Sequence, residues 1–143
     1  MADQANTREQ FKYWKSIEVR WGDMDAQGHV NNAVYFTYLE SARVELVRKI
    51  GFKGKLAGAA EGLALVSASC DFKRQVVYPA TLDVGARVES VGRRSFEMSY
   101  GIFVHRTDQL VASARSVNAW VDYAAERAVE LPDWFRAALA EYQ

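Results

Sequence analysis

A ten-residue stretch between two apolar segments carries the residues best suited to chemistry. It reads DMDAQGHVNN, residues 23–32, and it holds two carboxylates, an imidazole and three side-chain amides. Carboxylates and imidazoles act as general acids and bases, and a carboxylate can also attack a carbonyl carbon. The same residue types form turns and cap helices. The stretch is therefore either a solvated turn with several caps or the place where the chemistry occurs.

Several other chemistries are disfavoured by the pattern of residues. Asp23, Asp25 and His29 could bind a metal, but carboxylates at i and i+2 of an extended segment point to opposite faces, and the sequence has no His-x-x-x-His or second His/Asp cluster. Glycines recur at 51, 54, 58 and 62 without the Gly-Lys-Ser/Thr ending of a phosphate loop, and no Gly-x-Ser-x-Gly is present. Cys70 lies in an apolar segment, where a small buried thiol is the ordinary outcome.

The elements on either side of this stretch can be predicted from hydrophobic periodicity. Residues 16–21 alternate apolar Ile17, Val19 and Trp21 with polar neighbours, which is typical of a strand with one buried face. After the stretch, apolar residues recur at intervals of three and four, which predicts a helix over residues 32–50. Gly51 stands where a helix can end in a left-handed residue. The apolar stripe of this helix consists of Tyr35, Leu39, Ala42, Leu46 and Ile50.

The rest of the chain is dominated by strands. After a glycine-rich connection over residues 51–62, the sequence predicts strands over residues 63–72, 81–88, 96–104 and 111–121. The small apolar residues of 63–72 predict a central strand that is covered on both sides, and residues 107–109 predict a hairpin turn. Residues 131–142 predict a short final helix. This order indicates one α+β domain, residues 1–143, whose antiparallel sheet wraps one helix.

Composition excludes several classes of partner. The 143 residues include 18 basic and 18 acidic side chains, so no net charge attracts nucleic acid or an anionic membrane. No apolar run reaches the roughly 18 residues of a membrane span. The first ten residues, MADQANTREQ, lack the apolar core of a signal peptide, and the single cysteine cannot form an internal disulfide. We expect a soluble, cytoplasmic protein.

With these elements in place, the sequence resembles the hot-dog-fold acyl-CoA thioesterases of the 4-hydroxybenzoyl-CoA thioesterase-like family. The resemblance is concentrated in RWGDMD at 20–25 and GHVNN at 28–32, and it continues weakly to the end of the strands. Its motif residues outside those stretches are Tyr35, Tyr38, Glu40, Arg43, Cys70-Asp71-Phe72 and Tyr78-Pro79. The fold of that family, an antiparallel sheet wrapped around a long helix, agrees with the element order above.

The resemblance implies roles for three residues in hydrolysis of an acyl-CoA to a carboxylic acid and CoA. Asp25 would attack the thioester or activate water, and the backbone amide of Asn32 would polarise the carbonyl. A helix N-terminus offers unpaired N–H groups and partial positive charge to such an oxygen. Plant acyl-carrier-protein thioesterases have a similar motif in which His29 would take part, but Gln27 replaces their asparagine. His29 therefore either assists Asp25 or water, or has a structural role.

Other polar residues are assigned to structure or to substrate binding. Asp23 is predicted to be a turn residue that pairs with Arg20, and the side chains of Asn31 and Asn32 are both suited to capping the helix. The residues predicted to contact substrate around the reacting group are Gln27, Tyr35 and Glu40, with pairing to Arg43 as the alternative for Glu40.

Arginine and lysine pairs are candidates for the phosphates of CoA. Arg93 and Arg94 occupy a turn where the bacterial hydroxybenzoyl enzyme has a basic cluster, although a basic turn is often only solvated. Lys73 and Arg74 could contribute from a neighbouring subunit. Adjacent cations of this kind bind phosphate through charge-assisted hydrogen bonds.

The resemblance implies no metal or redox cofactor and predicts a homodimer or homotetramer. Two alternatives stay open: a module that binds acyl-CoA without catalysis, and a hot-dog dehydratase or hydratase. The first is disfavoured because a pure binder would gain nothing from a carboxylate beside the carbonyl. The acyl group is not specified by the sequence.

Overall fold

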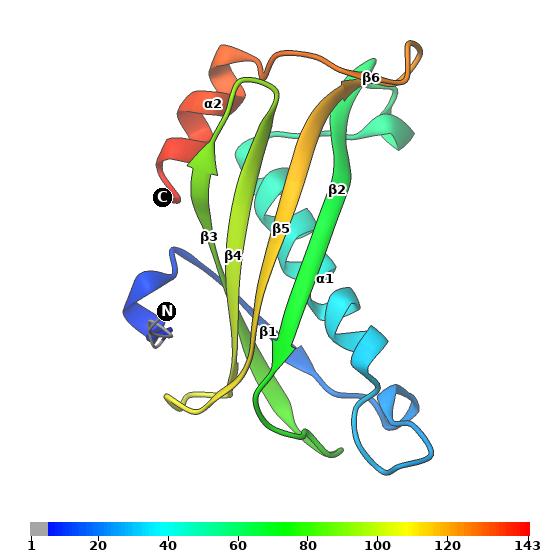
Figure 1. Ribbon diagram of the computed structural model, residues 1–143, viewed down its shortest axis with the longest axis vertical. Helices are drawn as coiled ribbons and strands as arrows, with labels where there is room; N and C mark the ends of the chain where they lie inside the picture. The colour runs from blue at the N-terminus through cyan, green and yellow to red at the C-terminus, as the bar shows by residue number, and fades with distance from the viewer. Residues whose placement is uncertain (1–5) are drawn as a thin grey trace.

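The computed structural model describes residues 6–143, which form one curved antiparallel sheet with a long helix across one face (Figure 1). The sheet has six strands in the order β1-β3-β4-β5-β2, with β6 paired to β5. The strands are β1 (Tyr13–Glu18), β2 (Glu61–Phe72), β3 (Thr81–Val91), β4 (Ser95–Val104), β5 (Leu110–Asp122) and β6 (Arg127–Ala128). The helices are α1 (Asn32–Ile50) and α2 (Asp133–Ala140), and short 3₁₀ turns occur at Arg8–Gln10, Trp21–Asp23 and Lys55–Ala57.

Helix α1 begins and ends where the sequence predicts. The Asn31 side chain caps its start by accepting a hydrogen bond from the Ala33 backbone N–H at 2.9 Å, and Gly51 ends it with φ 119°. That left-handed conformation suits glycine because a Cβ would be strained there. The buried face of the helix carries Tyr35, Tyr38, Leu39, Ala42, Arg43, Leu46 and Val47. The apolar members of this face pack into the single core beneath the sheet.

Two features of the outer strands differ from the prediction. Strand β1 begins at Tyr13 and ends at Glu18, and Trp21, predicted to be buried with Ile17 and Val19, is 78% exposed in a 3₁₀ turn. Strand β2 lies at an edge of the sheet and pairs only with β5, so the expectation of a central strand was wrong. Periodicity reports which residues are apolar but not the order of the strands.

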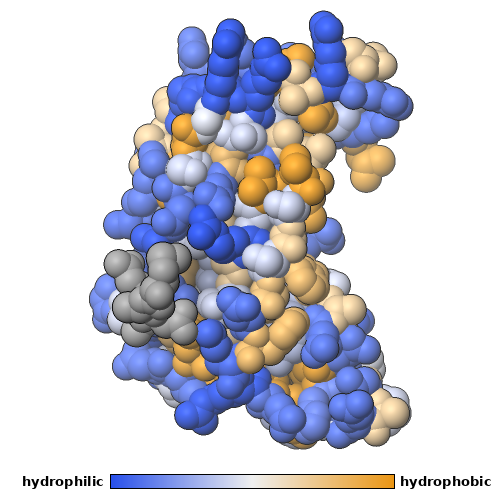
Figure 2. All heavy atoms as spheres, in the orientation of Figure 1, coloured by the Kyte–Doolittle hydropathy of each residue, from blue (hydrophilic) through white to orange (hydrophobic). Residues whose placement is uncertain are grey.

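The β2 edge leaves apolar surface uncovered in the single chain. Leu65 and Val66 are 51% and 62% exposed, although both lie within a strand. Figure 2 shows hydrophobic side chains gathered over strands β5 and β2 on the viewed face. Exposed apolar surface beside an unpaired strand edge is a common place for another chain to bind.

The hairpin turn predicted at 107–109 is confirmed, since it joins β4 to β5. The final helix is shorter than predicted and covers one end of the sheet, where Phe135 packs against Trp120 with ring centroids 4.8 Å apart. Within residues 6–143, no helix has the length and apolar character needed to cross a membrane.

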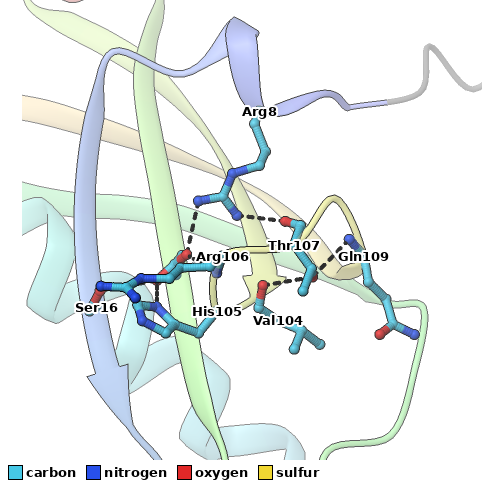
Figure 3. A network of polar contacts seen from close by, with 8 residues as sticks. Arg8, Ser16, Val104, His105, Arg106, Thr107 and Gln109 are labelled. Carbon is cyan, nitrogen blue, oxygen red and sulfur yellow. Dashed lines mark hydrogen bonds and ion pairs between the residues drawn. The ribbon is translucent and has the colours of Figure 1, made fainter.

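A buried carboxylate fastens the segment before β1 to the turn after β4 (Figure 3). Asp83 on β3 accepts hydrogen bonds from Arg8 Nη2 at 2.8 Å, Ser16 Oγ at 3.0 Å and the Arg106 backbone N–H at 2.9 Å. Its Oδ1 also lies 2.7 Å from Nδ1 of His105. Burial alone would raise the pKa of Asp83, but these hydrogen bonds outweigh it and hold the pKa far below its usual range.

Candidate active site

The polar stretch folds into a compact loop because its own backbone groups pair. The Asp25 N–H donates to the His29 carbonyl at 2.9 Å, and the Gly28 N–H donates to the Asp25 carbonyl at 3.0 Å. Gly28 has φ 84°, a conformation that glycine adopts without strain. The Val30 N–H then donates to the Val76 carbonyl at 2.9 Å, which joins the loop to the segment that follows β2. The loop therefore has a defined position relative to both α1 and the sheet.

Asp23 is buried and supports this loop from beneath. Its carboxylate accepts the Tyr38 hydroxyl at 2.6 Å and the Arg20 backbone N–H at 2.9 Å, and it forms an ion pair with the Arg20 side chain at 2.9 Å. The Asp23 carbonyl accepts the Asn31 N–H at 2.9 Å, directly before α1. Burial opposes ionisation of Asp23, but the hydrogen bonds from Tyr38 and Arg20 outweigh it and lower the pKa. The predicted pairing with Arg20 is confirmed.

Asp25, two residues later, lies in a different environment. Its side chain is half-buried, and its Oδ1 accepts one hydrogen bond, from the Gln27 backbone N–H at 2.8 Å. It lines a hollow of about 300 Å³ between the loop, the start of α1 and the end of β2. His29, Asn32 and Tyr35 line the same hollow. Asp25 thus faces open space, whereas Asp23 is surrounded by donors.

The start of α1 presents an unpaired donor to this hollow. The Asn31 side chain takes the Ala33 N–H and the Asn31 carbonyl takes the Val34 N–H. The backbone N–H of Asn32 has no acceptor among residues 6–143. A free N–H at a helix N-terminus is suited to an oxygen that gains negative charge.

The opposite wall comes from the end of β2 and the segment after it. Phe72, Lys73, Arg74 and Gln75 line the hollow, and the Phe72 ring packs edge-on against Tyr35 at 5.0 Å between centroids. The sequence suggests that Lys73 and Arg74 could contribute from a neighbouring subunit; within one chain, both line the hollow beside their own loop. Arg74 also lines an adjoining hollow of about 590 Å³, which lies between residues 74–77 and strands β3, β4 and β5.

Sequence reasoning missed Val30, Phe72 and Gln75 as lining residues. Phe72 belongs to a motif quoted for the family resemblance, so a signal for it existed. Nothing in the spacing or type of Gln75 marks it, because its position depends on how the segment after β2 folds back along the loop.

Three predicted substrate-binding residues lie elsewhere in the chain. Glu40 is exposed and lines separate hollows farther along α1. Arg93 and Arg94 occupy the turn between β3 and β4, at the end of the sheet remote from the polar loop (Figure 1). Arg93 forms an ion pair with Glu130 at 2.6 Å. One chain therefore does not bring these three residues to the hollow that contains Asp25.

The described part of the chain offers no better acid–base or nucleophilic centre. Burial, with a smaller effect from Asp71, raises the pKa of the Cys70 thiol to about 11, so the thiol is protonated at neutral pH. Asp83 and His105 form a carboxylate–imidazole pair, but the nearby Ser16 hydroxyl donates to the carboxylate and not to the imidazole that would activate it. Neither Asp83 nor His105 lines the hollow around Asp25. Among residues 6–143, no three His, Cys, Asp or Glu side chains are arranged to hold a metal ion.

Comparisons with known proteins identify the family and the fold of this chain. A family model described as the thioesterase-like superfamily matches residues 19–139. The crystal structure of the PA5185 protein from Pseudomonas aeruginosa superimposes with a TM-score of 0.88 at 31% identity, covering 96% of this chain and 95% of that one. The long-chain acyl-CoA thioesterase FadM of Escherichia coli is 24% identical over 125 residues, which cover 87% of this chain and 95% of the relative.

A 1,4-dihydroxy-2-naphthoyl-CoA thioesterase from Synechocystis has a similar fold. Its structure gives a TM-score of 0.82 at 19% identity, covering 90% of this chain and 95% of that one. The family match includes the loop, α1 and every residue that lines the hollow around Asp25.

Proposed function

Since this chain belongs to the thioesterase-like superfamily and is a thioester hydrolase with the hot-dog fold, we propose that it hydrolyses an acyl-CoA to a carboxylic acid and CoA, with Asp25 as the catalytic carboxylate. One observation carries the assignment. Asp25 and Asn32 line the same hollow, and the backbone N–H of Asn32 has no acceptor among residues 6–143. A thioester carbonyl bound there would have a carboxylate available for its carbon and a hydrogen-bond donor for its oxygen.

Two routes use the same groups. In the first, an Asp25 oxygen attacks the carbonyl carbon, the C–S bond breaks to release the CoA thiolate, and water hydrolyses the resulting anhydride. In the second, Asp25 takes a proton from water, the water oxygen attacks the carbonyl carbon, and the same C–S bond breaks. The Asn32 N–H stabilises the oxyanion in both. A thiolate leaves readily, so a carboxylate of ordinary basicity is adequate when it is well positioned.

His29 and Gln27 complete the wall of the hollow next to Asp25. The His29 backbone carbonyl accepts the Asp25 N–H, so the two residues are held close together. We assign His29 to orienting water or the Asp25 carboxylate, and Tyr35 with Phe72 to contact with the acyl group. Their apolar ring faces are suited to an aliphatic or aromatic group.

The phosphates of CoA need cations near the mouth of the hollow. Arg74 is exposed and lies between the hollow around Asp25 and the larger adjoining one, so it is placed to contact phosphate together with Lys73. Arg93 and Arg94 would reach the same CoA only from a second copy of the chain. The exposed apolar residues of β2 support a homodimer formed along that edge.

The test is thiol release from a panel of aliphatic and aromatic acyl-CoAs by the wild type, Asp25→Asn and Asp108→Asn. Asp108 is exposed in the β4–β5 turn and provides a matched control for the loss of one carboxylate. We expect turnover of at least one acyl-CoA, a loss of about a hundredfold or more in kcat for Asp25→Asn, and unchanged activity for Asp108→Asn. No turnover across the panel would remove acyl-CoA as the substrate. An active Asp25→Asn variant would remove Asp25 as the catalyst.

A further inference from the structure

Another hollow lies between α1 and the sheet, away from the loop that carries Asp25. It has a volume of about 430 Å³ and is bounded by the C-terminal half of α1, residues 52–56 and strands β2 and β5. A smaller hollow of about 130 Å³ lies next to it and shares Glu40, Arg43 and Leu65 with it. The apolar residues that line the larger hollow are Val44, Val47, Phe52, Leu56, Leu63 and Leu65. Its size and apolar walls are typical of small-molecule sites.

Arg43 is the buried charge between these two hollows. Arg43 is only 9% exposed. Its one hydrogen bond joins Nη1 to the Tyr100 hydroxyl at 3.4 Å, which is long for a hydrogen bond. Among residues 6–143, Arg43 forms no ion pair. A guanidinium keeps its charge in proteins and has five N–H donors, so most of its hydrogen-bonding capacity is unused here. A buried charge of this kind is costly unless an anion pairs with it.

The buried polar residues next to Arg43 form hydrogen bonds mainly with one another. Tyr100 is engaged by the Ser116 hydroxyl at 2.7 Å, and Asn118 donates to the same Ser116 oxygen at 3.1 Å. Tyr100, Ser116 and Asn118 are thus hydrogen-bonded to one another, and the guanidinium of Arg43 lies next to the two hollows. Among residues 6–143, Glu40 is the one carboxylate that lines both hollows; it is exposed and forms no ion pair with Arg43.

The charge around the larger hollow favours an anion. Three further cations line it at exposed positions, Arg48, Lys53 and Lys55, against the single carboxylate of Glu40. An anion on Arg43 would thus be attracted by the rim and would form charge-assisted hydrogen bonds with the guanidinium. The apolar walls require that the rest of the ligand be apolar.

We propose that this hollow binds a carboxylic acid with an apolar body, its carboxylate pairing with Arg43 and its body packing against the aliphatic walls from α1 and β2. The site does not depend on the proposed hydrolysis. An acid released by acyl-CoA hydrolysis belongs to the same chemical class, so the product of the reaction is one natural occupant.

The test is a direct binding measurement that involves no turnover. Dodecanoate and dodecanol, which have the same chain but differ in charge, are titrated calorimetrically into the full-length wild type, Arg43→Gln, Arg43→Lys and Arg127→Gln. We expect dodecanoate to bind the wild type at least about tenfold more tightly than dodecanol, a difference of about 1.4 kcal/mol. Arg43→Gln should lose that preference, Arg43→Lys should keep part of it, and Arg127→Gln, which removes an exposed cation that lines neither hollow, should leave binding unchanged.

Three outcomes would overturn the proposal. The first is equal binding of acid and alcohol by the wild type, a comparison that needs no variant and so is independent of folding. The second is a folded Arg43→Gln variant that binds dodecanoate as the wild type does. The third is failure of dodecanoate to bind at all; if Arg43→Gln then also alters the mass measured by light scattering, the counter-ion of Arg43 is a carboxylate of a second copy.

Discussion

Replacing Asp23 by asparagine separates the structural role of Asp23 from the catalytic role that we propose for Asp25. Oδ2 of Asp23 accepts from the Arg20 backbone N–H at 2.9 Å and from the Tyr38 hydroxyl at 2.6 Å. Oδ1 accepts from Nε and Nη2 of Arg20 at 3.1 and 2.9 Å. An asparagine must place its NH₂ group at one of these two positions, and each position is already surrounded by donors. Asp23→Asn therefore loses hydrogen bonds however its amide is oriented.

The expected cost follows from burial and from the exposure of the partners. Asp23 is 2% exposed, so each lost or reversed hydrogen bond to its backbone and tyrosine donors costs about 1–3 kcal/mol. The Arg20 side chain is 80% exposed, so its ion pair adds less than about 1 kcal/mol. We expect Asp23→Asn to lower the free energy of unfolding by about 2–4 kcal/mol and Tm by roughly 6–14 °C.

Urea unfolding and kcat, both measured well below Tm, provide the assay. Asp23→Asn should destabilise the fold while its folded fraction keeps kcat within about threefold of the wild type. Asp25→Asn should give the opposite result, with stability within about 0.5 kcal/mol, because its carboxylate has one local hydrogen bond at a half-buried position. The reasoning is refuted if Asp23→Asn is as stable as the wild type and loses activity about a hundredfold.

Three further predictions concern charge. Asp83 has a depressed pKa in the folded state, so its ionised form stabilises the fold above about pH 4, and that contribution declines as the pH falls further. The stability lost in Asp83→Asn, measured by urea unfolding, should be large at pH 7 and smaller at pH 3. An equal loss of stability at the two pH values would contradict this prediction. Arg74→Gln should raise KM about tenfold for acyl-CoA. It should not change KM for the corresponding acyl-pantetheine, because that substrate lacks the nucleotide phosphates. Equal effects on the two substrates would exclude a contact between Arg74 and the phosphates of CoA. With the pKa of its thiol raised to about 11, Cys70 should react slowly with iodoacetamide at pH 7.5 and faster as the pH approaches 10, and Cys70→Ala should keep wild-type kcat.

Much of the region around Asp25 could be predicted because its signals are local. The bounds of α1 follow from the asparagine cap, the apolar stripe and Gly51, all within one stretch of chain. The pairing of Asp23 with Arg20 joins residues three apart. Asp25, His29 and Asn32 lie in one hollow because a single loop and helix start carry them. Local geometry is largely determined by neighbouring residues.

The features that sequence reasoning missed depend on contacts between distant segments. The edge position of β2 is decided by which strand pairs with β5, and an apolar run carries no information about that choice. Gln75 lines the hollow around Asp25 only because the segment after β2 returns to the loop, where Val30 binds the Val76 carbonyl. Likewise, the burial of Arg43 without a carboxylate could not be anticipated, since a charged residue on a helix is ordinarily solvated.

Some polar groups of the loop at residues 23–32 form the hydrogen bonds that fix it, and others face the hollow around Asp25. The Asp23 carboxylate binds Arg20 and Tyr38, and the Asn31 side chain caps α1. Backbone hydrogen bonds of Asp25, Gly28 and Val30 join the loop to itself and to the segment after β2. This fixes the loop against α1 without using the groups that face the hollow around Asp25. The Asp25 carboxylate accepts one local hydrogen bond, from the Gln27 N–H, and the Asn32 N–H has no acceptor among residues 6–143, so both could meet a substrate without breaking the bonds that fix the loop. Preorganised groups of this kind stabilise a transition state without rearranging as charge develops, so a variant that loosens the engaged groups should impair catalysis only as far as it moves the free ones.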